Sequence, residues 1–190
     1  MTESALHAER YDLDELLKDE QRVKVWKAVE TTINAPCYYH QIAMPGESME
    51  HEKQLASAVL RNFARLKVPR LPRLVDGWID EKNVCAVEFK WEAEPLSLYG
   101  RNPLSGATPR HQRDIFERTL FQITKLHSNN IIHGQVRADA FGIDLRDKIF
   151  MIDSGLDRAV VRTLYENDAT IALATRLQAR DLADWAYAFL

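Results

Sequence analysis

The chain lacks the features that mark several large classes of protein. Among its 190 residues are only two cysteines, Cys37 and Cys85, which have neither metal-ligand spacing nor the density of a disulfide scaffold. Both lie in apolar, strand-like runs, which favours buried free thiols. No apolar run approaches the ~18 residues that cross a bilayer, and the polar, acidic N-terminus has no apolar core of a signal peptide. We therefore expect a cytoplasmic protein with no membrane partner.

An excess of positive charge is also missing. Lys and Arg number 25 against 28 Asp and Glu, which gives a net charge of −3, so nucleic acid is not an expected partner. Hydrophobic residues make up 46% and charged residues 28% of the chain, as is typical of globular proteins. The length suits one substantial domain or two small lobes that share an interface.

The first half of the chain is dominated by strand-like patterns. Its acidic, leucine-containing start is typical of a turn of helix, whereas β-branched and aromatic runs further along predict strands. Apolar residues recur at helical spacing after Ser48, which can cap that helix. The expected elements are a helical turn at 12–20, strands at 23–29, 37–44, 74–80 and 83–91, and a helix from 49 to 66.

The second half has mainly helical patterns. Residues 92–109 hold three of the seven prolines, together with glycines, which favours a hinge. Beyond it, the apolar periodicity predicts a helix over 110–126, two short strands "NIIH" and "KIFMID", and a final helix over 168–190. The predicted division is a strand-rich half over 1–93, a hinge over 94–109 and a helical half over 110–190.

Two short motifs carry a resemblance to a known family. The segment "LHSNNIIHGQVRADAFGI" is similar to the catalytic loop of eukaryotic-type protein kinases, written L-H-x-x-x-[IV]-[IV]-H-[RG]-D-[IL]-[KR]-P-x-N, and "IDSG" is similar to their metal-binding D-F-G. The resemblance implies an α+β, protein kinase-like fold with a small strand-rich lobe, a shortened helical lobe and a cleft between them. It also implies that Asp181 or Asp184 anchors the catalytic loop from the last helix.

At the positions where the resemblance places the usual phosphotransfer groups, this chain carries other residues. The family's catalytic Asp falls on Gln135, whose amide cannot act as a base. Its second metal ligand falls on Ala140, and the Lys that grips phosphates falls on His40. No Gly-x-Gly-x-x-Gly occurs anywhere in the chain. These losses disfavour Mg·ATP as a cofactor, and the cofactor stays unknown.

Several polar residues remain as candidates for the site. The catalytic candidates are His133, Asp139 and Asp153, of which Asp153 is also the candidate ligand for one magnesium ion. For each there is a plainer interpretation: a structural ring for His133, a solvated loop carboxylate for Asp139, and a loop acid that binds nearby amides for Asp153. The candidate cleft residues are His40, Glu88 and Arg137, and Arg137 could neutralise a phosphate or pair with Asp153.

Three functions are compatible with this pattern. The first is a pseudokinase that binds a protein partner or a small molecule through the interlobe cleft. The second is a repurposed enzyme that acts on a non-nucleotide small molecule, and the third is a compact atypical kinase that uses Asp153 with a displaced base such as Asp139. The apolar C-terminal sequence "WAYAFL" predicts, in addition, a surface for self-association or for a partner.

Overall fold

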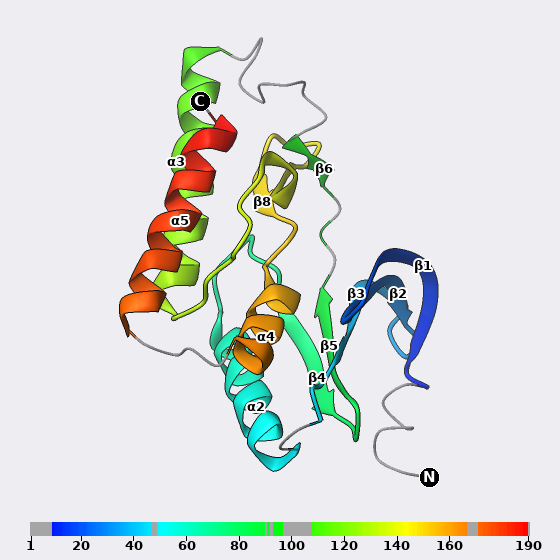
Figure 1. Cartoon of the computed structure of the whole chain (residues 1–190). Coiled ribbons are helices and arrows are strands. Elements are labelled where there is room, and N and C mark those ends of the chain that lie inside the picture. Colours follow the sequence, from blue (N-terminus) through cyan, green and yellow to red (C-terminus); the bar gives the residue numbers. More distant parts are fainter. Residues whose placement is uncertain are drawn as a thin grey trace. The chain divides into compact units, whose positions relative to one another are not determined.

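A computed structural model describes residues 9–46, 49–89, 91, 93–96, 108–166 and 171–189. These residues form a mixed α+β structure with an antiparallel five-stranded sheet, a second three-stranded sheet and four helices (Figure 1). The chain divides into two compact units. The first comprises Met1–Arg65, Arg73–Lys90 and Val160–Asn167, and the second comprises Leu66–Pro72, Trp91–Ala159 and Asp168–Leu190. Ser48 and most of the proposed hinge lie outside the described residues.

The five-stranded sheet forms the body of the first unit. Its order is β1-β2-β3-β5-β4, and helix α2 follows β3 in the chain. The bounds are β1 Tyr11–Glu20, β2 Val23–Glu30, β3 Ala35–Ala43, α2 Met49–Arg65, β4 Leu74–Ile79 and β5 Asn83–Phe89. The predicted strands and helix are confirmed, but the predicted helical turn at 12–20 is wrong. That segment forms β1, because pairing with β2 along its length outweighs the helical preference of its acids and leucines.

One face of the sheet carries a separate aromatic core. Buried residues there are joined by two partly buried tryptophans, and the whole set is Tyr11, Trp26, Ala28, Cys37, Tyr39, Trp78, Cys85 and Val87. The ring of Tyr11 on β1 stacks on that of Trp78 on β4, with centroids 6.1 Å apart, and its hydroxyl donates to Asp76 Oδ2 at 3.1 Å. The two edge strands therefore meet at this end of the sheet. Burial raises the pKa of both cysteine thiols to about 11, so they are neutral, as predicted for buried free thiols.

Two helices and a small sheet make up most of the second unit. The elements are β6 Glu94–Pro95, α3 Pro109–Ser128, β7 Phe141–Ile143, β8 Ile149–Met151 and α5 Ile171–Phe189. Helix α4, Leu156–Tyr165, starts in this unit and ends among residues of the first. Helices α3 and α5 run side by side (Figure 1), and Trp185 Nε1 on α5 donates to Thr119 Oγ1 on α3 at 3.0 Å. Thr108 caps α3 and Pro109 is its first residue, a position that suits proline.

Two expectations for this unit need correction. The predicted strand "NIIH" is wrong: residues 131–133 have no regular structure, and the partner of β8 is β7, which starts at Phe141. The apolar C-terminal side chains were expected to lie exposed, yet Trp185 and Phe189 are buried inside their own unit, while Tyr187 is 90% exposed. The physical reason given for self-association at this helix therefore does not hold for Trp185 and Phe189.

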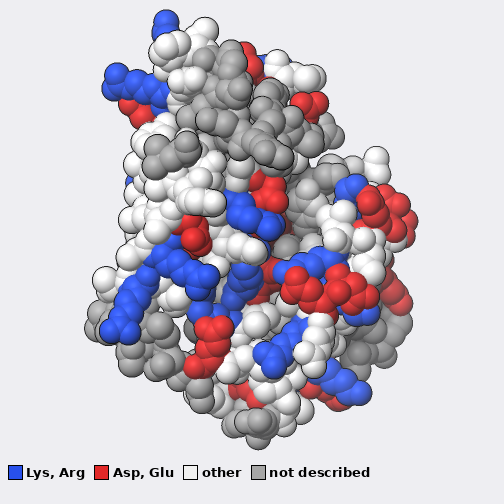
Figure 2. Space-filling view, turned by 45° about the horizontal axis from the view of Figure 1, so that its top comes forward, with Lys and Arg blue, Asp and Glu red and all other residues white. Residues whose placement is uncertain are grey.

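The surface carries charges of both signs. On the face shown in Figure 2, Lys and Arg are interspersed with Asp and Glu. Within the described part of the chain, no helix combines the length and the apolar character that spanning a membrane requires.

Candidate functional site

The loop after α3 is fixed by one buried carboxylate, Asp181 on α5. Its Oδ2 accepts the backbone N–H of His133 at 2.8 Å, and its Oδ1 accepts that of Gly134 at 2.8 Å. The Nε2 atom of His127 lies 3.0 Å from the same Oδ2. Burial alone would raise the pKa of Asp181, but the bonds from His127 and the two backbone amides hold it below its usual range. The anchoring acid is thus Asp181 and not Asp184, which faces Arg180 on the surface.

The ring of His133 joins this loop to the one that contains Asp153. Its Nδ1 accepts the backbone N–H of Gln135 at 3.3 Å, so the ring hydrogen sits on Nε2, which donates to the Asp153 carbonyl oxygen at 2.8 Å. Burial lowers the pKa of His133, against the pull of the Asp153 carboxylate. The ring is therefore neutral, and both of its nitrogens are bonded to backbone. The structure thus gives His133 the plainer of its two interpretations, a structural ring.

The Asp153 carboxylate is held by an arginine from the first turn of α4. Arg158 Nη2 lies 2.8 Å from both carboxylate oxygens, and the backbone N–H of Gly155 donates to Oδ1 at 2.9 Å. Arg158 Nε also donates to the carbonyl oxygen of His133 at 3.0 Å. Burial would raise the pKa of Asp153, but the charge of Arg158 and the bonds from Arg158 and Gly155 hold it well below its usual range. Because His133 is neutral, the positive charge beside this carboxylate comes from Arg158.

Gly155 allows the two loops to approach closely. Its φ is +75°, a conformation that residues with a side chain rarely adopt, and a Cβ there would lie 2.5 Å from the carbonyl oxygen of His133. The backbone of "IDSG" thus packs directly on the backbone of "IIHG". The loops form one rigid frame held by Asp181, His133, Gly155 and Arg158.

The residues expected to do chemistry do not converge on Asp153. Arg137 pairs with Asp139, with Nη2 3.1 Å from Oδ2, and both side chains are largely exposed. Ala140 is buried in the short 3₁₀ turn Ala138–Ala140. The cation on Asp153 is Arg158, which the sequence analysis missed. Helix α4, which was not predicted either, starts three residues after Asp153, and its first turn brings this basic side chain back to the carboxylate.

The groups around Asp153 do not fit a magnesium ion. Magnesium needs near-octahedral oxygen ligands, whereas both carboxylate oxygens of Asp153 accept from a guanidinium and Ala140 offers no donor atom. Within the described ranges, no group of three or more His, Cys, Asp and Glu side chains is placed to hold a metal.

The other two candidate residues belong to the first unit. His40 on β3 and Glu88 on β5 are buried, with His40 Nε2 3.3 Å from Glu88 Oε2. A carboxylate beside the imidazole repels a phosphate, so this pair is a poor substitute for a phosphate-binding lysine. The turns that join the first three strands, residues 21–22 and 31–34, contain no glycine.

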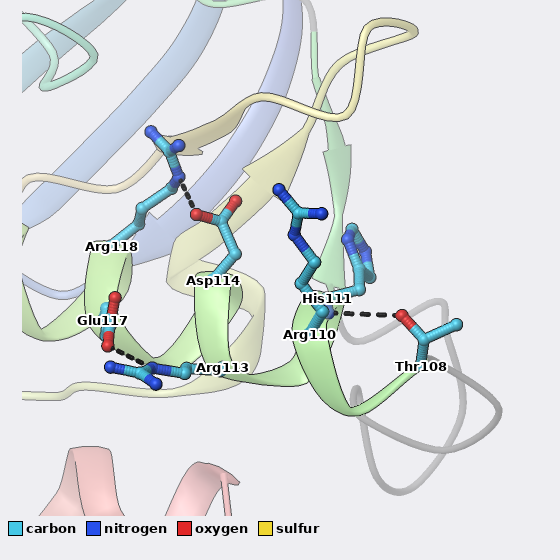
Figure 3. Close-up of a pocket in the computed structure, with 7 residues that line it drawn as sticks. All are labelled: Thr108, Arg110, His111, Arg113, Asp114, Glu117 and Arg118. Atoms are coloured by element: carbon cyan, nitrogen blue, oxygen red, sulfur yellow. Dashed lines mark hydrogen bonds and ion pairs between the residues drawn. The ribbon is translucent and has the colours of Figure 1, made fainter.

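A cavity of about 550 Å³ lies at the start of α3 and shares no residue with the loops described above (Figure 3). Two ion pairs along the helix neutralise most of its charges: Arg113 with Glu117 at 2.6 Å, and Arg118 with Asp114 at 2.7 Å. Arg110, His111 and Thr108 complete the lining. Most of the charged side chains that line the cavity are thus paired with one another.

Comparison with known proteins adds no assignment: no protein-family model matches the chain, and no curated protein matches it.

Proposed function

We propose that this protein is a pseudokinase, a kinase-like protein that transfers no phosphate and acts by binding another molecule. The observation that carries the proposal is the Arg158 guanidinium on the Asp153 carboxylate, where a kinase would hold its metal. An arginine supplies the positive charge that the carboxylate needs. Because it donates to both oxygens of Asp153, it does not link that carboxylate to phosphate oxygens by shared coordination as a metal ion does.

The neighbouring positions support the same function. Gln135 replaces the catalytic base by an amide, and Ala140 replaces a metal ligand by a methyl group. Asp139 is the acid that could act as a displaced base, but it lies on the surface in a pair with Arg137. Phosphate transfer would need a base, a metal and a phosphate clamp together, and the residues at these places supply none of the three.

The frame of the loops supports a binding role. Asp181, His133 and Arg158 satisfy one another and the adjoining backbone without any bound group. These side chains are buried or half-buried and form a support rather than a surface. A support that is ordered before binding lowers the conformational entropy cost when a partner docks on the loops that it holds. Loops that are held in place but carry no catalytic base suit a protein that binds a partner and does not react with it.

The test is transfer of the γ-phosphate from Mg·ATP or Mn·ATP to water, to the protein itself and to a mixed peptide library. We expect no transfer by the wild type or by Asp139→Ala. Transfer by the wild type that disappears in both Asp139→Ala and Asp153→Asn would overturn the proposal in favour of a compact kinase. Glu81→Lys, on an exposed turn, serves as the folded control.

A further inference from the structure

Strand β1 leaves one long side of the five-stranded sheet without a strand partner in the described part of the chain. It is ten residues long and is an edge strand of the sheet, with β2 on its other side. Its first residue is tied to β4, through the contacts of Tyr11 with Trp78 and Asp76. From Asp12 to Glu20 the outer side presents backbone N–H and C=O groups that can pair with another extended segment.

Apolar side chains extend the aromatic core to this side. Leu13, Leu16 and Leu17 are 43%, 44% and 44% exposed. Leu13 lies opposite Ala28 on β2, and Leu16 lies opposite Trp26. Residues opposite each other across two strands share a face of the sheet, so Leu13 and Leu16 continue the face of the aromatic core. Another strand beside β1 would cover them.

The charge on β1 restricts what can lie there. The strand holds five acids and one lysine in the sequence "YDLDELLKDE". Three of the acids are in ion pairs: Glu15 with Lys27, Asp19 with Lys24 and Glu20 with Lys18. Asp12 and Asp14 are exposed and form no ion pair with another described residue, although Asp14 is one of the acids that raise the pKa of Lys27. A second copy on the same side would set acids against acids, which is unfavourable.

We propose that the outer side of β1, from Asp12 to Glu20, binds an extended basic segment of a partner protein by strand addition. The partner's backbone continues the antiparallel ladder, its apolar side chains lie beside Leu13 and Leu16, and its Lys or Arg side chains lie near Asp12 and Asp14. Two irregularities in the β1–β2 register, at 13–16 and 16–18, twist the strand and oppose indiscriminate edge pairing. The exposed acids of β1 therefore favour a basic segment over other extended segments. This proposal is independent of the pseudokinase proposal.

The test uses a fluorescein-labelled peptide of about nine residues, enough to pair with the segment from Asp12 to Glu20, that alternates Lys and Val. Its binding to the full chain is measured by fluorescence anisotropy at physiological ionic strength. A matched peptide has Pro in place of its central Val and so cannot complete a ladder. We expect the first peptide to bind and the Pro peptide to bind about tenfold more weakly.

Two charge reversals on β1 locate the site. Asp14→Lys, and independently Asp12→Lys, should each weaken binding about tenfold, while Glu81→Lys, which changes the net charge equally at the exposed turn between β4 and β5, should not. Circular dichroism checks that each variant is folded.

Three results of the binding measurements would overturn the proposal. They are no binding of the Lys/Val peptide, equal binding of the Pro peptide, and equal weakening by Glu81→Lys. A dimer in light scattering that Asp14→Lys alters would also overturn it, in favour of a second copy of the chain.

Discussion

Two sets of positions within residues 131–158 contrast sharply. The frame positions His133, Gly155 and Arg158 are tied to each other, to Asp181 and to the backbone by bonds of 2.8 to 3.0 Å. The positions where chemistry is expected carry an amide at Gln135, a methyl group at 140 and an exposed ion pair at 137 and 139. The contrast teaches that a loop can be held in one fixed arrangement by contacts that are separate from the positions where chemistry is expected.

The largest effect is expected where the frame is anchored. Asp181→Ala removes the acceptor of two backbone N–H groups and the partner of His127 in a buried place. We expect a loss of about 4 kcal/mol in the free energy of unfolding. The matched control is Asp184→Ala on the same helix, whose surface pair with Arg180 is worth no more than about 0.5 kcal/mol. Urea unfolding followed by tryptophan fluorescence measures both, and equal midpoints would contradict the anchoring role.

A smaller effect is expected where the loops touch. Gly155→Ala combines an unfavourable φ, worth about 1 to 2 kcal/mol, with a collision against the His133 backbone, and should cost about 3 kcal/mol in all. Gly46→Ala is the control, since Gly46 has a similar φ of +81° and no neighbour within 4 Å of the added Cβ. The difference between the two variants in urea unfolding isolates the collision. If they lose equal stability, the close approach of the two loops is refuted.

The smallest effect is a dependence on pH. Burial lowers the pKa of His133 in the folded protein, while the unfolded chain keeps the ordinary value of about 6.5. The unfolded state therefore binds the extra proton, so the stability is complete above about pH 6.5 and falls below it, by up to about 1.4 kcal/mol per pH unit. His133→Asn should flatten the slope of stability between pH 7 and 5, and His51→Asn, on the exposed side of α2, should not. A slope unchanged in His133→Asn would contradict the neutral buried ring.

Local pattern was enough to predict most elements and part of the site. Period-two and helical patterns located β2, β3, β4, β5, α2, α3 and α5. Segment 12–20 was misassigned because helix-forming acids and leucines there are overruled by pairing with β2 across the two-residue turn 21–22. Helix α4 was not predicted. The role of Arg158, which lies in its first turn, was therefore not predicted either. The bond between Arg158 and Asp153 depends on how α4 leaves the loop, which short-range pattern does not encode.

The choice between Asp181 and Asp184 shows the same limit. Both acids lie on one predicted helix, three residues apart, and only the packing of α5 against α3 decides which one faces the loop. The placement of the final helix was predictable from the sequence. Which of its faces is buried was not.

The most direct test of the account is a thermal-shift titration of the wild-type protein with ATP, with and without magnesium. A ligand at about 100 times its Kd stabilises the folded state by about 2.7 kcal/mol, which is readily seen as a rise in Tm. Because Arg158 holds the Asp153 carboxylate, we predict no magnesium-dependent shift at millimolar ATP. A magnesium-dependent rise in Tm that Asp153→Asn abolishes would show that the carboxylate is open to a metal ion, and would contradict the account.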